Sequence, residues 1–175
     1  MTTIVAIETL AGVQIGCDSQ ATGGDKIQLE QPKIFANNGI VFGVAGVALL
    51  ANELRYADLP TPPQEPEATD KWMTRELIPA IRAVLGQVPM KGDDDGDFEM
   101  QLIVIANCRA YEVGGNTGWV RNTAGIYTIG SGGPYAAGAI SAGVSLQTAL
   151  EIAAKHDPYT GYQITATTDR ELLAQ

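Results

Sequence analysis

The pattern of hydrophobic and polar positions predicts short strands at the start of the chain. Residues 3–7 are β-branched or apolar, and the extended pattern resumes over 13–16 after a turn. Two more strands are predicted over 33–35 and 40–45, separated by the turn sequence at 37–39. Four short strands joined by tight turns indicate a mainly antiparallel sheet.

Helical spacing of apolar positions follows this first group of strands. Residues 47–59 carry apolar side chains on one side at helical spacing, and Pro60 ends that segment. A second helix is predicted to begin at Thr69 or Asp70, which can cap it, and to end at Gly86. The two helices together have enough apolar surface to cover one face of a sheet.

The second half of the chain repeats the order of strands and then helices. Strands are predicted over 100–106, 109–113, 119–121 and 126–129. Two helices rich in small residues follow over 135–142 and 145–155, and then one more strand over 162–168 and a short tail of acidic and basic residues.

The order of strands, two helices, strands, two helices and a strand predicts the fold class. Each pair of helices can cover one face of a pair of packed sheets, which gives a four-layer αββα sandwich of the α+β class. A doubly wound parallel fold is excluded because strands do not alternate with single helices. No linker divides the chain, so residues 1–175 are expected to form a single domain.

Composition and charge narrow the classes of function. The chain is 45% hydrophobic and 18% charged, which excludes a disordered protein. No apolar run reaches the roughly 18 residues that a membrane helix needs, and the first residues lack the basic region of a secretory signal. A net charge of −9 disfavours binding to nucleic acid or anionic lipid.

The two cysteines are too few for a disulfide framework, so a cytoplasmic location is expected. Both Cys17 and Cys108 lie in strand patterns and are expected to be buried thiols of the core. The single histidine, His156, excludes a metal site with several histidines and is expected at a helix C-terminus, where it interacts with the helix dipole. No cofactor or metal is expected.

Thr2 has the chemistry of a nucleophile, although a Thr at this position can equally be the start of a strand. A small residue after Met1 is the context in which the initiator Met is removed, and removal would free the α-amine of Thr2. An α-amine has a pKa of about 7.7–8.0, so it can accept the proton of the hydroxyl on the same residue.

Asp18 and Lys33 are candidate partners for Thr2, although an Asp and a Lys can equally form an ordinary surface ion pair. In a partly buried site the charge of Lys33 would lower the pKa of a nearby amine and stabilise a developing alkoxide. The Asp18 carboxylate would hold Lys33 charged and oriented.

A glycine-rich loop at 130–133 lies between a predicted strand and a predicted helix. It lacks the Gly-Lys-Ser/Thr of a phosphate-binding loop, and Ile129 occupies the position of the first glycine of a nucleophile elbow. A tight turn with a helix cap is the simplest interpretation, and Ser131 remains available as a hydrogen-bond partner. The acidic run 93–97 lacks the spacing of an EF-hand and is expected to be a solvated loop.

Several short segments occur in the order of one known family, and they span nearly the whole chain. They are Thr2-Thr3-Ile4-Val5, 16–22, Lys33-Ile34, Val44-Ala45-Gly46, 129–136 and 157–161. The first four resemble the opening of proteasome β-type peptidases, and 129–136 resembles the bacterial peptidase HslV. The last resembles the Asp-x-x-Ser-Gly stretch of proteasome β subunits, with Thr160 in place of Ser. The absence of a propeptide before Thr2 is similar to HslV.

The resemblance implies an N-terminal nucleophile hydrolase fold and the activity of a threonine peptidase. By the family's pattern Thr2 would be the nucleophile and, through its amine, the base. Asp18 and Lys33 would tune it, and the Gly46 N–H would donate to the oxyanion. Three further residues would surround the amine with hydrogen bonds: Ser131, Asp157 and Thr160.

The resemblance also implies partners. The substrate would be a peptide or an unfolded protein, cleaved through an acyl-enzyme ester. Members of the family form rings of identical subunits, and a ring-shaped AAA+ unfoldase supplies the substrate.

Two other functions fit the same residues. One is a non-catalytic assembly protein that keeps the fold and retains Met1. The other is an amidohydrolase for small amides, because related folds with N-terminal nucleophiles carry out that chemistry.

Overall fold

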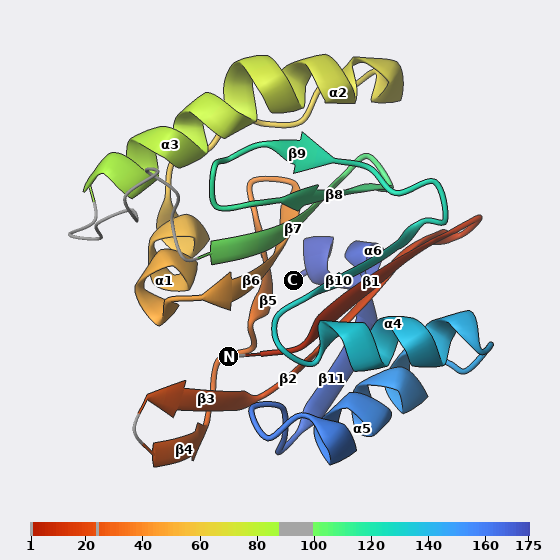
Figure 1. Ribbon diagram of the computed structural model, residues 1–175. Helices are drawn as coiled ribbons and strands as arrows, with labels where there is room; N and C mark the ends of the chain where they lie inside the picture. The colour runs from red at the N-terminus through yellow and green to blue at the C-terminus, as the bar shows by residue number, and fades with distance from the viewer. Residues whose placement is uncertain (1, 24, 88–99) are drawn as a thin grey trace.

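Two antiparallel sheets lie face to face in the computed structural model, which describes residues 2–23, 25–87 and 100–175 (Figure 1). The first sheet has the strand order β10-β1-β2-β11 and the second has the order β5-β6-β7-β8-β9. The strands of the first sheet are β1 Ile4–Thr9, β2 Gly12–Asp18, β10 Ile126–Ile129 and β11 Ile164–Thr168. Those of the second are β5 Ile34–Asn37, β6 Ile40–Gly46, β7 Met100–Ala106, β8 Arg109–Val113 and β9 Trp119–Val120.

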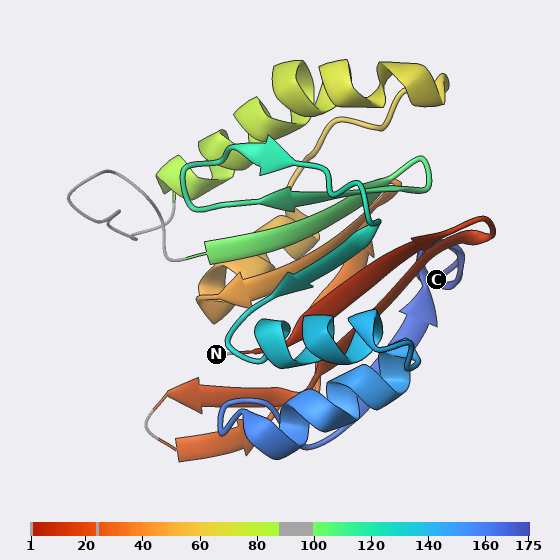
Figure 2. The same cartoon turned by 45° about the vertical axis from the view of Figure 1, so that its right-hand side comes forward.

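Helices cover the outer face of each sheet, as Figures 1 and 2 show. The second sheet is covered by α1 Ala48–Tyr56 and by one long helical segment made of a 3₁₀ turn Pro66–Ala68, α2 Thr69–Trp72, a π-helical turn Met73–Leu77 and α3 Ile78–Gln87. The first sheet is covered by α4 Gly133–Ser141 and α5 Leu146–His156. The predicted four-layer αββα sandwich is confirmed.

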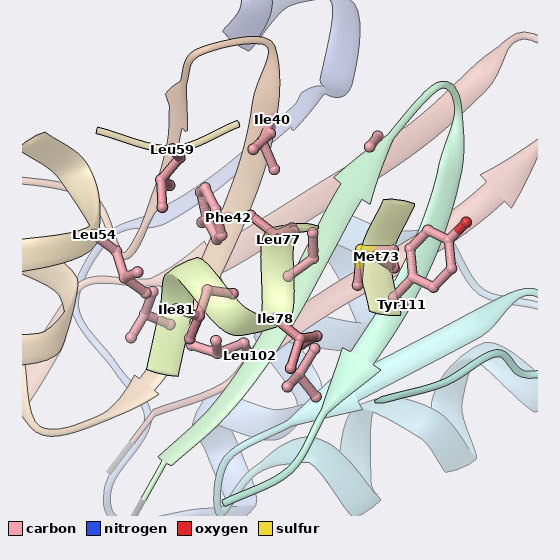
Figure 3. Packing of buried hydrophobic residues seen from close by; sticks show 14 of the residues in the cluster. Ile40, Phe42, Leu54, Leu59, Met73, Leu77, Ile78, Ile81, Leu102 and Tyr111 are labelled. Atoms are coloured by element: carbon pink, nitrogen blue, oxygen red, sulfur yellow. The ribbon is translucent and has the colours of Figure 1, made fainter. Parts of the chain in front are cut away.

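The described residues form three apolar clusters between the four layers. One fills the space between α1–α3 and the second sheet, and it includes Phe42, Leu102, Leu77 and Ile81 (Figure 3). Another lies between the two sheets and includes Ile4, while a smaller one joins the first sheet to α4 and α5. The central strands β2, β6 and β7 are buried over most of their length, because a layer covers each side.

Helix α5 packs closely on β2 at Gly16, where the strand has no side chain. A Cβ atom on Gly16 would overlap the side chains of Leu146 and Leu150, both of which belong to the buried cluster of α4 and α5. Glycine at this position therefore lets the helix approach the backbone of the strand.

Between β2 and β5 the structure has a separate pair of strands for which the sequence pattern predicts no element. Strands β3 Gln20–Gly23 and β4 Asp25–Gln28 pair antiparallel beside the main sheets. Every residue of β4 is exposed, so no alternation of apolar and polar positions marks it. The hairpin projects from the end of the molecule where β1 begins and where α1 lies (Figure 1).

The expected tail after residue 168 is also wrong, because α6 Asp169–Leu173 forms there. Thr168 caps this helix, and the Glu171 side chain accepts a hydrogen bond from the main-chain N–H of Thr168, which is the capping-box arrangement. Leu172 is buried in the cluster between the sheets, so α6 belongs to the core.

Two smaller expectations need correction. Cys108 is exposed rather than buried, because it lies with Asn107 in the turn between β7 and β8, and both have positive φ (58° and 52°). The first helix ends at Tyr56 instead of residue 59, although Leu59 is still buried in the cluster between the helices and the second sheet.

Within the described residues, no helix has the length and hydrophobicity that a bilayer crossing requires.

Candidate active site

The carboxylate of Asp18, the last residue of β2, is fully buried and accepts four hydrogen bonds. Its Oδ1 accepts from the Thr3 main-chain N–H at 2.9 Å and from the Lys33 ammonium at 2.7 Å. Its Oδ2 accepts from the main-chain N–H groups of Gln20 at 3.0 Å and Gly161 at 3.1 Å. A carboxylate has about four lone-pair sites, so these donors satisfy it completely.

Lys33 lies immediately before β5 and its side chain is only 6% exposed. Its carbonyl accepts from the Val44 N–H at 3.0 Å, which fixes the main chain of Lys33 against β6. Burial lowers the pKa of the Lys33 ammonium from its usual value, and the neighbouring Asp18 carboxylate opposes that effect. The charge of this buried cation therefore depends chiefly on the Asp18 carboxylate.

Thr2 and Lys33 line the same cavity, which has a volume of about 940 Å³. Thr2 precedes β1 and is 5% exposed. Gly46, at the end of β6, lines the cavity too and has φ of +123°, a conformation that side-chain-bearing residues rarely adopt. The rest of the wall comes from the β3–β4 hairpin, the segment after it and one side of α1.

A chain of hydroxyl groups joins Thr3 to a second carboxylate. Thr160 Oγ1 donates to Asp157 Oδ2 at 2.5 Å, and Ser131 Oγ donates to the same oxygen at 2.7 Å. Since Thr160 uses its only proton there, Thr3 Oγ1 must be the donor in its 2.6 Å contact with Thr160 Oγ1. The Tyr159 N–H donates to the other oxygen of Asp157 at 3.2 Å.

The glycine-rich loop packs directly against Thr2 and Thr3. Gly130 has φ of +84°, and a Cβ atom there would overlap the carbonyl oxygen of Thr2. A Cβ atom on Gly132 would overlap the hydroxyl of Thr3. Gly132 is also the N-cap residue of α4, so the loop is both the expected helix start and a close neighbour of the first strand.

The structure thus brings the predicted site residues into two connected groups. Asp18 and Lys33 form one, and Ser131, Asp157 and Thr160 form the other. Both groups bond to Thr3, the first at its main-chain N–H and the second at its hydroxyl. The remaining two predicted residues, Thr2 and Gly46, share the cavity with Lys33.

Other candidates from the sequence lie elsewhere. His156 is the last residue of α5, is exposed, and stacks on Tyr135 with ring centroids 5.7 Å apart. Cys17 is buried beside Asp18, and burial raises the pKa of its thiol to about 11, which keeps it protonated and unreactive at neutral pH. The acidic run 93–97 lies outside the described residues. Over the described ranges, no group of three or more potential metal ligands occurs.

Thr3 and Gln20 belong to the site although the sequence pattern predicts no role for them. A β-branched residue such as Thr3 at the start of a strand is common, so nothing sets it apart. The Gln20 amide donates to the Pro158 carbonyl at 3.0 Å, and the residue also lines the cavity. It ties the β3–β4 hairpin to the loop that carries Asp157. No pattern of hydrophobicity marks such a link between segments 138 residues apart.

No protein-family model matches the chain, and no curated protein matches it in sequence. Solved structures do match the chain. BPH from Thiobacillus denitrificans is 19% identical with a TM-score of 0.74, and alignment covers 95% of this chain and 96% of that one. BPH in complex with epoxomicin is 18% identical with a TM-score of 0.72, and alignment covers 95% of this chain and 97% of that one.

Two further structures extend the similarity. HslV from Trypanosoma brucei is 23% identical with a TM-score of 0.67, and alignment covers 95% of this chain and 98% of that one. Anbu, an ancestral beta-subunit from Yersinia bercovieri, is 14% identical with a TM-score of 0.65, and alignment covers 95% of this chain and 80% of that one. With two packed antiparallel sheets between two helical layers, the chain has the N-terminal nucleophile hydrolase fold of HslV and proteasome-like subunits.

Proposed function

We propose that the chain is a threonine peptidase, the proteolytic subunit of a proteasome-like or HslV-like particle. The observation that carries this proposal is the buried ion pair of Lys33 and Asp18 beside the cavity that Thr2 also lines. A buried ion pair contributes little to stability by itself, so its position beside a threonine is better explained by chemistry.

The proposed reaction begins with removal of Met1, which frees the α-amine of Thr2. The amine takes the proton from Thr2 Oγ1 as that oxygen attacks the carbonyl carbon of the scissile peptide bond. The cation of Lys33 keeps the amine partly neutral at physiological pH and stabilises the developing alkoxide. A positioned N–H, proposed to be that of Gly46, would stabilise the oxyanion by about 2.7–4 kcal/mol.

The intermediate collapses when the peptide C–N bond breaks and the leaving amine takes the proton held by the Thr2 amine. An ester then joins Thr2 Oγ1 to the acyl half of the substrate, and water hydrolyses it with the same amine as base. We propose that Ser131, Asp157 and Thr160 orient that amine. Their hydroxyl and carboxylate groups already form one hydrogen-bonded chain that ends at Thr3.

The cavity favours a peptide over a small amide. Its volume of about 940 Å³ lies near the upper end of the range for ligand sites, about 300–1,000 Å³. Its walls include one side of α1 and the β3–β4 hairpin, which together can hold an extended chain on either side of the scissile bond. We therefore propose peptides or unfolded proteins as substrates.

We further propose that residues 1–175 work as one domain, that identical subunits form a ring in the cytoplasm, and that an AAA+ unfoldase supplies the substrate. A net charge of −9 argues against nucleic acid as the partner of that ring. Particle mass by sedimentation tests the assembly. A monomer at micromolar concentration would contradict it.

The decisive experiment combines intact mass with peptide hydrolysis. We expect purified protein to lack Met1 and to cleave peptide amides, and Thr2→Ala to abolish cleavage while the melting temperature stays the same. Thr123→Ala, at an exposed residue that does not line the cavity, is the matched control and should retain full activity. Epoxomicin, which BPH binds, should bind the wild type and not Thr2→Ala.

The outcomes separate the rival functions. Retained Met1 without cleavage of any peptide supports the assembly protein. Hydrolysis of small amides alone, by a monomer, supports the amidohydrolase. Unchanged peptide turnover by Thr2→Ala refutes the proposed nucleophile.

A further inference from the structure

One side of α1 forms part of the cavity wall. The cavity is lined by Ala48, Ala51, Asn52 and Arg55, which recur at the spacing of one helix face, while Leu50 and Leu54 are buried in the core. The two alanines leave space near the start of the helix, and Arg55 is the cation of this face. The side chains of a helix lean toward its N-terminus, so Arg55 leans toward the end of α1 that follows Gly46.

Two contacts hold the guanidinium of Arg55 against the segment that contains Lys33. Its Nη2 donates to the Pro32 carbonyl at 2.8 Å, and Pro32 precedes Lys33. The guanidinium also lies over the ring of Phe35, 4.2 Å from the centroid. Both contacts fix the guanidinium against the segment 32–35, so the charge has a defined position.

Arg55 has no anionic partner in the part of the chain that the structure describes. No carboxylate oxygen in residues 2–23, 25–87 or 100–175 lies within 4.0 Å of the guanidinium, and its Nε is buried without a hydrogen-bond partner. Burial also lowers the pKa of the guanidinium from its usual value. An anion in the cavity would relieve the cost of this partly desolvated charge.

The other charged residues of the cavity do not neutralise Arg55. Lys33 is paired with Asp18. Asp25 and Glu30 line the cavity from β4 and the segment after it, and both are exposed to solvent, where their charges are screened. Among the described residues that line the cavity, Arg55 is therefore the fixed cation that a substrate group can pair with.

We propose that Arg55 is a specificity-determining residue that selects substrates with an acidic side chain, Asp or Glu, next to the scissile bond. This inference rests on the proposed peptidase function. The carboxylate of the substrate would accept hydrogen bonds from the terminal N–H groups that Pro32 leaves free, in the bidentate geometry that arginine gives carboxylates. Its aliphatic part would occupy the space beside Ala48 and Ala51.

The experiment compares three peptide amides that differ only in the residue before the fluorogenic leaving group: Glu, Leu or Lys. We expect the wild type to cleave the Glu peptide with the highest kcat/KM. Arg55→Met keeps the length of the side chain and removes the charge, and it should lower kcat/KM for Glu by roughly 10- to 100-fold, the value of one hydrogen bond to a charged group. The Leu peptide should change by less than about threefold.

Charge reversal and a distant arginine give the controls. Arg55→Glu should make the Lys peptide the preferred substrate. Arg75→Met, at an exposed residue of the π-helical turn that does not line the cavity, should leave all three ratios unchanged. Thermal melting of each variant checks the fold, because Arg55 also stacks on Phe35.

The wild type alone already decides the question if the variants do not fold. Preference for Leu or Lys over Glu in the wild type, or the same Glu-to-Leu ratio in Arg55→Met, overturns the role of Arg55 while the peptidase function stands. Absence of cleavage of all three peptides refutes the proposed function and the role of Arg55 together.

Discussion

Replacing Asp18 with Asn removes the counter-charge of Lys33 and keeps the size of the side chain. Asn offers one acceptor oxygen where the carboxylate satisfies four donors. The ammonium of Lys33, which has no other hydrogen-bond acceptor in the described part of the chain, is then left buried and uncompensated. The converse change, Lys33→Met, leaves the Asp18 carboxylate with the main-chain N–H groups of Thr3, Gln20 and Gly161.

This asymmetry sets the expected sizes of the two effects. Removing one partner of a buried ion pair costs about 3–5 kcal/mol when the other charge is left without compensation. Asp18→Asn should fall in that range. Lys33→Met should cost about 1.5–3 kcal/mol, the contribution of one hydrogen bond to a charged group. The double variant should lose less than the sum of the two, because neither charge remains buried alone.

Urea unfolding at a fixed protein concentration measures these differences. With a slope of about 2 kcal/mol per M, a loss of about 4 kcal/mol lowers the unfolding midpoint by about 2 M. An effect of Lys33→Met equal to or larger than that of Asp18→Asn would refute the reasoning, and so would strict additivity in the double variant. Either result would mean that the three main-chain donors do not hold the carboxylate as the structure indicates.

Three further predictions test the neighbouring groups. Gly132→Ala should destabilise the protein by about 1–3 kcal/mol, because the added methyl group would push apart Thr3 and Thr160. Gly138→Ala is the control for thermal melting and should be neutral or stabilising, because nothing described lies within 4 Å of the added methyl group. Thr160→Ser should keep the hydroxyl chain and the proposed activity, whereas Thr160→Val should break the chain and lower kcat; equal kcat in both variants would contradict the role of the hydroxyl. Burial raises the pKa of the Cys17 thiol from 9.0 to about 11, so the stability that the protonated thiol contributes is complete below pH 9 and is lost as the pH rises through 11. Each pKa unit between the folded and unfolded states corresponds to about 1.36 kcal/mol, so the wild type should lose about 3 kcal/mol more stability than Cys17→Ala across that interval. If the two curves of unfolding free energy against pH are parallel, the thiol does not titrate in this way.

Much of the fold could be predicted from hydrophobic patterning. Strands β7, β8 and β10 agree with the predicted ranges to the residue, since each is an apolar or alternating run between turn residues. The β3–β4 hairpin was missed because its exposed β4 strand has no buried face. Helix α6 was missed although Thr168 and Glu171 carry a capping box, a signal that the sequence does contain.

The candidate site could be predicted only in part. The sequence predicts Asp18 and Lys33 as an oppositely charged pair, and their contact at 2.7 Å follows from β2 lying in contact with β5. The role of Thr3 could not be predicted, because it depends on the register that sets Thr3 against Asp18 and on a loop 157 residues away. Nor does sequence patterning reveal that the apolar ring of Phe35 fixes a cation in the cavity.

The close approach of α5 to β2 at Gly16 affects how substitutions spread through the molecule. Asp18 ends that strand, and Asp157 directly follows that helix. The two carboxylates therefore belong to one closely packed unit, in which Leu146 and Leu150 of the helix lie directly against the backbone of the strand at Gly16. Substitutions in the opposite half of the sandwich, away from Lys33, should leave the distance between the two carboxylates unaltered.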